Sequence, residues 1–124
     1  MHILVVDDDE RCLASIESFL VEEGHSIYTA THGEGAVAVA RRVRARNERI
    51  DVSILDYRMP DLTGVETYLQ LRVEFPALGA IFVSGEPFST LRRAFAALED
   101  FSFVQKPLKL IEVRKVLYEF ERRD

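Results

Sequence analysis

Residues 51–61 read DVSILDYRMPD, in which an apolar run ends at Asp56 and a turn containing Pro60 begins. A short apolar run bounded by turn signals is typical of a buried strand. The carboxylate of Asp56 is therefore predicted to lie at the exit of a strand, on the edge of a sheet.

Three other apolar runs lead into polar residues in the same way. They are HILVV (2–6) before Asp7, Asp8 and Asp9, AIFV (80–83) before Ser84 and Gly85, and FSFV (101–104) before Lys106 and Pro107. Acids, a hydroxyl and a lysine at four strand ends indicate a functional site.

Composition limits the class of protein. With 124 residues, 48% of them hydrophobic and 30% charged, the chain fits one globular domain. Its apolar runs are too short to span a membrane, and the amino terminus lacks a signal-peptide pattern, so a cytoplasmic protein is expected. The net charge of −5 argues against direct nucleic-acid binding. The single cysteine, Cys12, excludes an internal disulfide and is interpreted as a small core residue.

Strand-like and helix-like segments alternate along the whole chain. The expected strands are 2–6, 25–30, 51–55, 80–83 and 101–104. Of the expected helices, the first ends before Gly24, the second covers 33–46, and the third starts after Pro60 and Gly64 and stops at Pro76. The fourth starts near Ser89 and Thr90, with Leu91, Phe95 and Leu98 on one face, and the fifth runs through Leu110 to Phe120. Five such units predict an α/β fold with a parallel sheet, helices on both faces and right-handed crossovers. Ligands of such sheets bind at the carboxyl ends of the strands.

The predicted convergence of Asp7, Asp8 and Asp56 has a chemical consequence. Three adjacent carboxylates raise one another's pKa and need a cation to remain ionised. Oxygen ligands favour a hard ion, and Mg²⁺ fits best because it takes one or two carboxylates together with phosphate oxygens. One carboxylate could then attack phosphorus. Lys106 would pair with a phosphoryl oxygen, Ser84 would offer its hydroxyl, and Gly85 would leave room for the group.

With these motifs in place, the chain resembles the receiver domain of bacterial two-component response regulators over residues 1–124. The motifs that carry the resemblance are ILVVDDD (3–9), LDYRMP (55–60) with Gly64, VSG (83–85) and VQKP (104–107). The resemblance implies a flavodoxin-like, doubly wound (βα)5 fold with a five-stranded parallel sheet in the order 2-1-3-4-5.

The resemblance also implies residue roles. Asp56 would be the phosphoacceptor, Asp8 the direct magnesium ligand, Asp7 a ligand acting mainly through water, and Arg58 a ligand through its backbone carbonyl. A cis peptide bond is expected before Pro107. Asp9 has no such role and is expected at a helix start, where an acid is favourable.

A switch follows from the same resemblance. On phosphorylation Ser84 would move toward the phosphoryl group and Phe103 would turn inward, by a shift between two packings. Because Phe103 lacks the hydroxyl of the more usual tyrosine, we expect this switch to rely on packing alone. The fourth helix, fifth strand and fifth helix would form the output surface, with candidate contacts at Arg92, Arg93, Arg114 and Lys115.

These roles describe a signalling switch rather than a turnover enzyme. A histidine kinase or phosphotransfer protein would supply the phosphoryl group, an unknown effector would read it, and the output surface could support a homodimer. Arg58 and Glu86 lie two residues beyond Asp56 and Ser84. They either form an ion pair that shields the acyl phosphate or are two solvated side chains worth little to each other.

Two alternative functions remain at this stage. A phosphohydrolase of the haloacid dehalogenase type would use Asp7 in DDDER (7–11) as its nucleophile, but Arg11 breaks that motif and no cap domain is present. A degenerate receiver would act only as a binding module, without magnesium or phosphate. The complete set of acids, hydroxyl and lysine argues against it.

Overall fold

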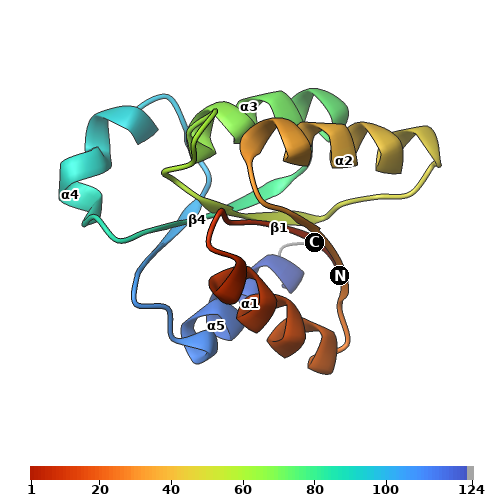
Figure 1. Cartoon of the computed structure of the whole chain (residues 1–124), viewed down its shortest axis with the longest axis horizontal. Helices are drawn as coiled ribbons and strands as arrows, with labels where there is room; N and C mark the ends of the chain where they lie inside the picture. Colours follow the sequence, from red (N-terminus) through yellow and green to blue (C-terminus); the bar gives the residue numbers. More distant parts are fainter. Residues whose placement is uncertain (123–124) are drawn as a thin grey trace.

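The computed structural model describes residues 1–122 and contains a five-stranded parallel sheet in the order β2-β1-β3-β4-β5 (Figure 1). The strands are β1 (His2–Val6), β2 (Ser26–Ala30), β3 (Val52–Asp56), β4 (Gly79–Ser84) and β5 (Ser102–Gln105). The helices are α1 (Glu10–Glu22), α2 (Gly33–Ala45), α3 (Gly64–Glu74), α4 (Phe88–Leu91), the 3₁₀ helix η1 (Arg92–Phe95) and α5 (Leu110–Glu121). The predicted α/β fold and strand order are confirmed. Arg123 and Asp124 of the predicted domain lie outside the described residues.

Helices cover both faces of the sheet because the strands are apolar on both sides. Along β1, Ile3 and Val5 point into a core beneath α1 and α5, whereas Leu4 and Val6 point into the core beneath α2, α3 and α4. Figure 1 shows α1 and α5 together on one side of the sheet, with α2 and α3 on the other. This two-sided burial is the pattern of a doubly wound parallel sheet.

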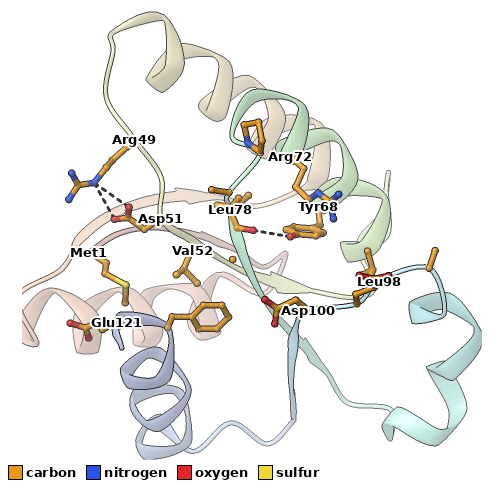
Figure 2. A pocket seen from close by; sticks show the side chains of 16 residues that line it. Met1, Arg49, Asp51, Val52, Tyr68, Arg72, Leu78, Leu98, Asp100 and Glu121 are labelled. Carbon is orange, nitrogen blue, oxygen red and sulfur yellow. Dashed lines mark hydrogen bonds and ion pairs between the residues drawn. The ribbon is translucent and has the colours of Figure 1, made fainter. Parts of the chain in front are cut away.

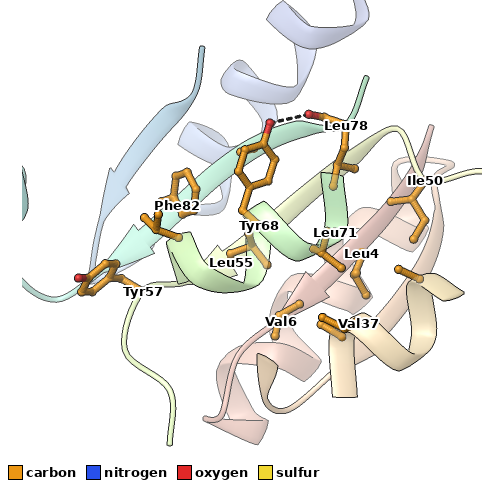
Figure 3. Close-up of a cluster of buried hydrophobic side chains, with 14 of the residues drawn as sticks. Leu4, Val6, Val37, Ile50, Leu55, Tyr57, Tyr68, Leu71, Leu78 and Phe82 are labelled. Carbon is orange, nitrogen blue, oxygen red and sulfur yellow. Dashed lines mark hydrogen bonds between the residues drawn. The ribbon is translucent and has the colours of Figure 1, made fainter. Parts of the chain in front are cut away.

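The core under α2 and α3 is the larger of the two and is shown in Figure 3. Tyr68 of α3 crosses it, and its hydroxyl donates a 2.8 Å hydrogen bond to the carbonyl of Leu78. The ring of Tyr68 packs edge-on against Phe82 of β4, with 5.7 Å between ring centroids. A buried tyrosine whose hydroxyl is paired adds apolar packing without leaving an unsatisfied polar group.

The first and third helices begin at residues whose side chains cap them. As expected, Asp9 stands at the start of α1, where its carboxylate accepts the N–H groups of Arg11 (3.0 Å) and Cys12 (3.3 Å). Thr63 and Glu66 form a reciprocal capping box at the start of α3. These caps satisfy backbone N–H groups at the helix starts, next to the carboxyl edge of the sheet.

The fourth helix differs from its prediction. It begins at Phe88 rather than at Ser89 or Thr90, lacks a side-chain cap, and continues as 3₁₀ turns from Arg92. The ring of Phe88 packs against Phe95, Phe101 and Phe103, at centroid distances of 5.4 to 6.1 Å. We attribute the break to this aromatic cluster, which holds the segment close to β5. The predicted inward positions Leu91, Phe95 and Leu98 are nevertheless all buried.

Strand β3 extends one residue further than predicted, and this places the site. Asp56 pairs with Val83 of β4, and the N–H of Tyr57 donates to the carbonyl of Val83 at 2.8 Å. Asp56 is therefore held by the sheet itself, at the last position of the strand.

None of the helices within residues 1–122 is both long and apolar enough to cross a bilayer.

We predict that Gly64→Ala destabilises the protein. A Cβ at Gly64 would lie 2.7 Å from the backbone oxygen of Asp56 and 3.1 Å from Cα of Tyr57, so the backbone beside the site would have to move. We expect a loss of about 1–3 kcal/mol in the free energy of unfolding, measured by urea denaturation. Gly85→Ala is the control, because a Cβ there meets no atom within 4 Å. Equal stability of the two variants would contradict this account.

Candidate functional site

The acids at the carboxyl edge converge as predicted. β1 and β3 are neighbours, with Val6 opposite Leu55, so the next residues of the two strands, Asp7 and Asp56, stand side by side. Asp7, Asp8 and Asp56 each place a carboxylate oxygen within 4.8 Å of those of the other two. Asp7 and Asp56 are 2% and 7% exposed, whereas Asp8 is open to solvent. The cluster lies where the strand order reverses, the position at which such sheets bind ligands.

Lys106 completes this cluster from the far edge of the sheet. Its Nζ lies 3.3 Å from a carboxylate oxygen of Asp7 and 3.6 Å from one of Asp56. Its backbone N–H donates to the carbonyl of Ser84 at 2.7 Å, and the bond to Pro107 is cis, as expected. Burial lowers the pKa of Lys106, but the charges of Asp56 and Asp7 outweigh burial and hold that pKa above its ordinary value.

The crowding of negative charge changes the acidity of Asp56. Desolvation by burial, followed by the charge of Asp7, raises the pKa of Asp56 from 3.8 to about 7, while Lys106 acts in the opposite direction. Asp8 raises the pKa further through a hydrogen bond and its charge. A cation bound among these oxygens would reverse the balance, because it favours the ionised form.

Ser84 lies at the end of β4, next to β3, and its side chain is buried. Its Oγ accepts the N–H of Glu86 at 3.0 Å. Because a hydroxyl both accepts and donates, its proton stays available for a further hydrogen bond. A Cβ at Gly85 would meet no atom within 4 Å, so the space beside this residue is open.

Arg58 and Glu86 form an ion pair, and both side chains stay partly exposed to solvent. The Nε of Arg58 donates to Oε1 of Glu86, and an Nη donates to Oε2 at 3.2 Å. The guanidinium also lies over the ring of Tyr57, 5.5 Å from its centroid. The hydrogen bonds and charge of Glu86 raise the pKa of Arg58, and the pKa of Glu86 is lowered in return.

Phe103, the predicted switch aromatic, is half-buried on β5 and packs toward α4 and η1. Its ring centroid lies 5.4 Å from that of Phe88 and 5.8 Å from that of Phe95. Phe95 in turn contacts Phe82, the neighbour of Phe103 across the β4–β5 pair. The aromatic cluster thus connects β5 to the segment that covers it.

Two other predicted residues have clear environments. Cys12 is half-buried beside the site, where desolvation and a hydrogen bond with Asp7 raise its pKa to about 12, which is the behaviour of an unreactive thiol. Arg114 faces α1 rather than α4, because it pairs with Glu23 and lies over the ring of Phe19. Arg92, Arg93 and Lys115 remain exposed.

Two features were not predicted from the sequence. Asp61 binds backbone N–H groups of α2, and no local pattern signals this because its partners lie 27 and 28 residues away.

A pocket of about 1090 Å³ also opens at the amino-terminal edge of the sheet (Figure 2). It is lined by charges of both signs, including the Arg49–Asp51 pair, and contains none of the predicted site residues.

A family model for the response regulator receiver domain matches residues 3–118. The chain belongs to this family. Receiver domains are the phosphoacceptor, regulatory domains of two-component signalling, and they interact with histidine kinases and downstream effectors. Family membership selects the receiver interpretation over the haloacid dehalogenase alternative.

Curated relatives of this receiver domain are transcriptional regulators. The chain is 33% identical over 111 residues to the probable transcriptional regulatory protein TcrX of Mycobacterium tuberculosis, covering 90% of this chain and 45% of TcrX. It is 30% identical over 109 residues to the transcriptional regulatory protein GlrR of Escherichia coli, covering 86% of this chain and 23% of GlrR. The chain therefore spans less than half the length of these two relatives.

Solved structures share the receiver fold. The chemotaxis protein CheY4 of Vibrio cholerae matches with a TM-score of 0.84 at 24% identity, over 96% of this chain and 97% of that one. The response regulator TrrA of Thermotoga maritima, solved in complex with Mg²⁺ and BeF, matches with a TM-score of 0.78 at 26% identity, over 96% and 97% of the two chains.

We predict that Asp56→Asn stabilises the metal-free protein at high pH. The folded carboxyl has a raised pKa of about 7 against 3.8, so the native state holds this proton more tightly than the unfolded state. The stabilisation from protonation is present at low pH and is lost as pH rises through about 7. Asparagine cannot ionise and avoids this loss.

Denaturant unfolding in EDTA measures the effect. The stability difference between Asp56→Asn and wild type should grow by about 2–3 kcal/mol from pH 5 to pH 8. A difference independent of pH would show that the carboxyl does not titrate in this range.

Proposed function

We propose that this receiver domain accepts a phosphoryl group on Asp56 in a reaction that needs Mg²⁺. The supporting observation is the convergence of Asp7, Asp8, Asp56 and Lys106, which come from three strand ends far apart in the sequence. A sheet does not gain stability from gathering three carboxylates, two of them buried, so their convergence requires a chemical reason.

The donor set fits magnesium. All of the candidate side-chain ligands are oxygen atoms, and the open side at Asp8 allows coordinated water and a phosphate oxygen to complete the shell. Asp8 would bind directly, Asp7 mainly through water, and Asp56 and the backbone carbonyl of Arg58 would complete the protein ligands. The bound ion would neutralise charge on the phosphoryl group during transfer.

The residues of the chain supply the remaining steps. An ionised oxygen of Asp56 attacks phosphorus, a P–O bond forms, and the P–N bond to the donor's phosphohistidine imidazole breaks, so that the electron pair leaves with the imidazole nitrogen. Lys106 pairs with one phosphoryl oxygen, and the hydroxyl of Ser84 donates to another. Gly85 leaves the space that the group occupies.

The negative charge of the phosphoryl group would then change how the neighbouring side chains pack. Movement of the Ser84 hydroxyl toward the phosphoryl group would vacate space behind it, into which Phe103 would turn. The contacts of Phe103 with Phe88 and Phe95 support this proposal, because any movement of Phe103 must repack α4 and η1. The surface formed by α4, β5 and α5 would then bind a different partner. The exposed residues Arg92, Arg93 and Lys115 are candidate contacts on this surface. A homodimer is one possible complex.

The donor would be a histidine kinase or a phosphotransfer protein, and the location would be the cytoplasm. The domain would catalyse only its own phosphorylation, as a switch rather than a turnover enzyme, without binding nucleic acid itself. The degenerate receiver is the alternative function, and it predicts neither magnesium binding nor phosphate uptake.

We predict that a small acyl-phosphate donor phosphorylates the wild-type chain only when Mg²⁺ is present. Asp56→Asn should take up no phosphate, and Asp8→Asn should be slowed at least about tenfold because it removes a direct ligand. Intact-mass spectrometry measures the added phosphoryl group. Asp51→Asn serves as the matched control at the opposite edge of the sheet. Absence of phosphate on wild type would favour the degenerate receiver.

We predict that the Arg58–Glu86 pair prolongs the lifetime of phosphorylated Asp56. The pair joins residues that lie two positions beyond Asp56 and Ser84, where it would limit the approach of water to the acyl phosphate. Arg58→Ala and Glu86→Ala should each shorten the lifetime about two- to tenfold, a modest effect expected of an exposed ion pair. The decay of the phosphorylated species is followed by intact mass after donor removal. Unchanged lifetimes in both variants would refute shielding.

A further inference from the structure

Hydrogen bonds of Asp61 connect the loop between β3 and α3 to the start of α2. Its Oδ1 accepts the N–H of Gly33 at 3.0 Å and that of Leu62 at 2.8 Å, while its Oδ2 accepts the N–H of Glu34 at 2.7 Å. His32, which precedes α2, provides no side-chain cap. Asp61 therefore caps α2 from a distant part of the chain, and this cap joins two loops of the carboxyl edge.

The electrostatics of Asp61 agree with this role. Desolvation opposes its ionisation, but the N–H groups of Glu34, Gly33 and Leu62 together outweigh desolvation and lower its pKa to about 2. The carboxylate is thus ionised at neutral pH, and its hydrogen bonds to the helix start are charge-assisted.

The loop between β3 and α3 is also held by a hydrogen bond between its two ends and by close contact with Gly33. The N–H of Gly64 donates to the carbonyl of Tyr57 at 2.7 Å, which closes the loop where it leaves the sheet. Gly33 lies so close that a Cβ there would stand 2.8 Å from Cβ of Leu62 and 2.5 Å from Oγ1 of Thr67. The segment from Tyr57 to Asp61 is therefore fixed at both ends, and Arg58 lies between them.

We propose that Asp61 is a positioning residue for the metal site, because its cap on α2 fixes the loop that carries the backbone carbonyl of Arg58. This inference rests on the proposed function, in which that carbonyl is a magnesium ligand. Mg²⁺ demands near-ideal geometry, so a carbonyl held in place before binding avoids the cost of ordering the loop. Residues that orient metal ligands typically change affinity by 10- to 100-fold when replaced.

Titration of the full chain with MgCl₂ at pH 8 tests the proposal. Binding is followed by calorimetry and by the carbonyl ¹³C resonance of Arg58, which reports on the loop itself. Asp61→Asn keeps the shape of the side chain, but its amide group cannot accept both N–H groups of α2. Glu10→Gln is the matched control, because it removes the same charge from an exposed acid that lines a surface pocket together with Asp8 and Asp61 and takes no part in the cap.

We expect Asp61→Asn to weaken magnesium binding about tenfold, at low and at high ionic strength, and Glu10→Gln to change it less than twofold. Thermal melting confirms that each variant is folded, and Asp61→Ser, which retains one capping oxygen, replaces any Asp61→Asn sample that is not. Equal affinity of the Asp61 variants and wild type overturns the proposal. Equal losses in Asp61→Asn and Glu10→Gln also overturn it, because charge alone would then explain the effect. Wild type that binds no Mg²⁺ removes the proposed function, and this inference with it.

Discussion

Electrostatic repulsion among Asp7, Asp8 and Asp56 is the constraint on which the carboxyl edge of this receiver domain depends. The sheet holds their oxygens within 4.8 Å of one another, and Lys106 is the cation that compensates them within the described residues. Desolvation, followed by the charge of Asp7, raises the pKa of Asp56 to about 7, so ionisation of this carboxyl is disfavoured in the metal-free site. A site that is electrostatically unfavourable when empty gains most from a divalent cation and a phosphoryl group.

Side-chain caps hold the loops around this cluster to the starts of three helices. Asp9 caps α1, the Thr63 and Glu66 pair caps α3, and Asp61 caps α2 from across the edge. Because each cap uses the positive end of a helix, three helices help to define the geometry of one edge. On the other side of the sheet's end, Phe88, Phe95 and Phe103 form a less regular region in which α4 breaks into 3₁₀ turns. In the proposed switch, this irregular segment is the part whose packing would change when charge is added at the site.

Much of the fold could be predicted from the sequence, because its strands are short, apolar on both faces and each followed by a distinct polar motif. The boundaries failed where tertiary contacts outweigh local preference. β3 extends to Asp56 because Val83 offers a pairing partner, and α4 starts at Phe88 because its ring joins the aromatic cluster. Arg114 was a candidate contact of the output surface, and its side chain contacts Phe19 of α1 and Glu23 just after that helix.

The sequence by itself determined which chemical groups stand at the strand ends, because apolar runs ending in Asp56, Ser84 and Lys106 are local features of the chain. Only the tertiary structure decided how those groups interact. The distance of 3.3 Å between Lys106 and Asp7 depends on the register of four strands, and the cap of Asp61 on α2 joins residues 27 and 28 positions apart. The physical reason is that a pKa or a hydrogen bond depends on separation in space and on exclusion of water, and neither is encoded in the order of neighbouring residues.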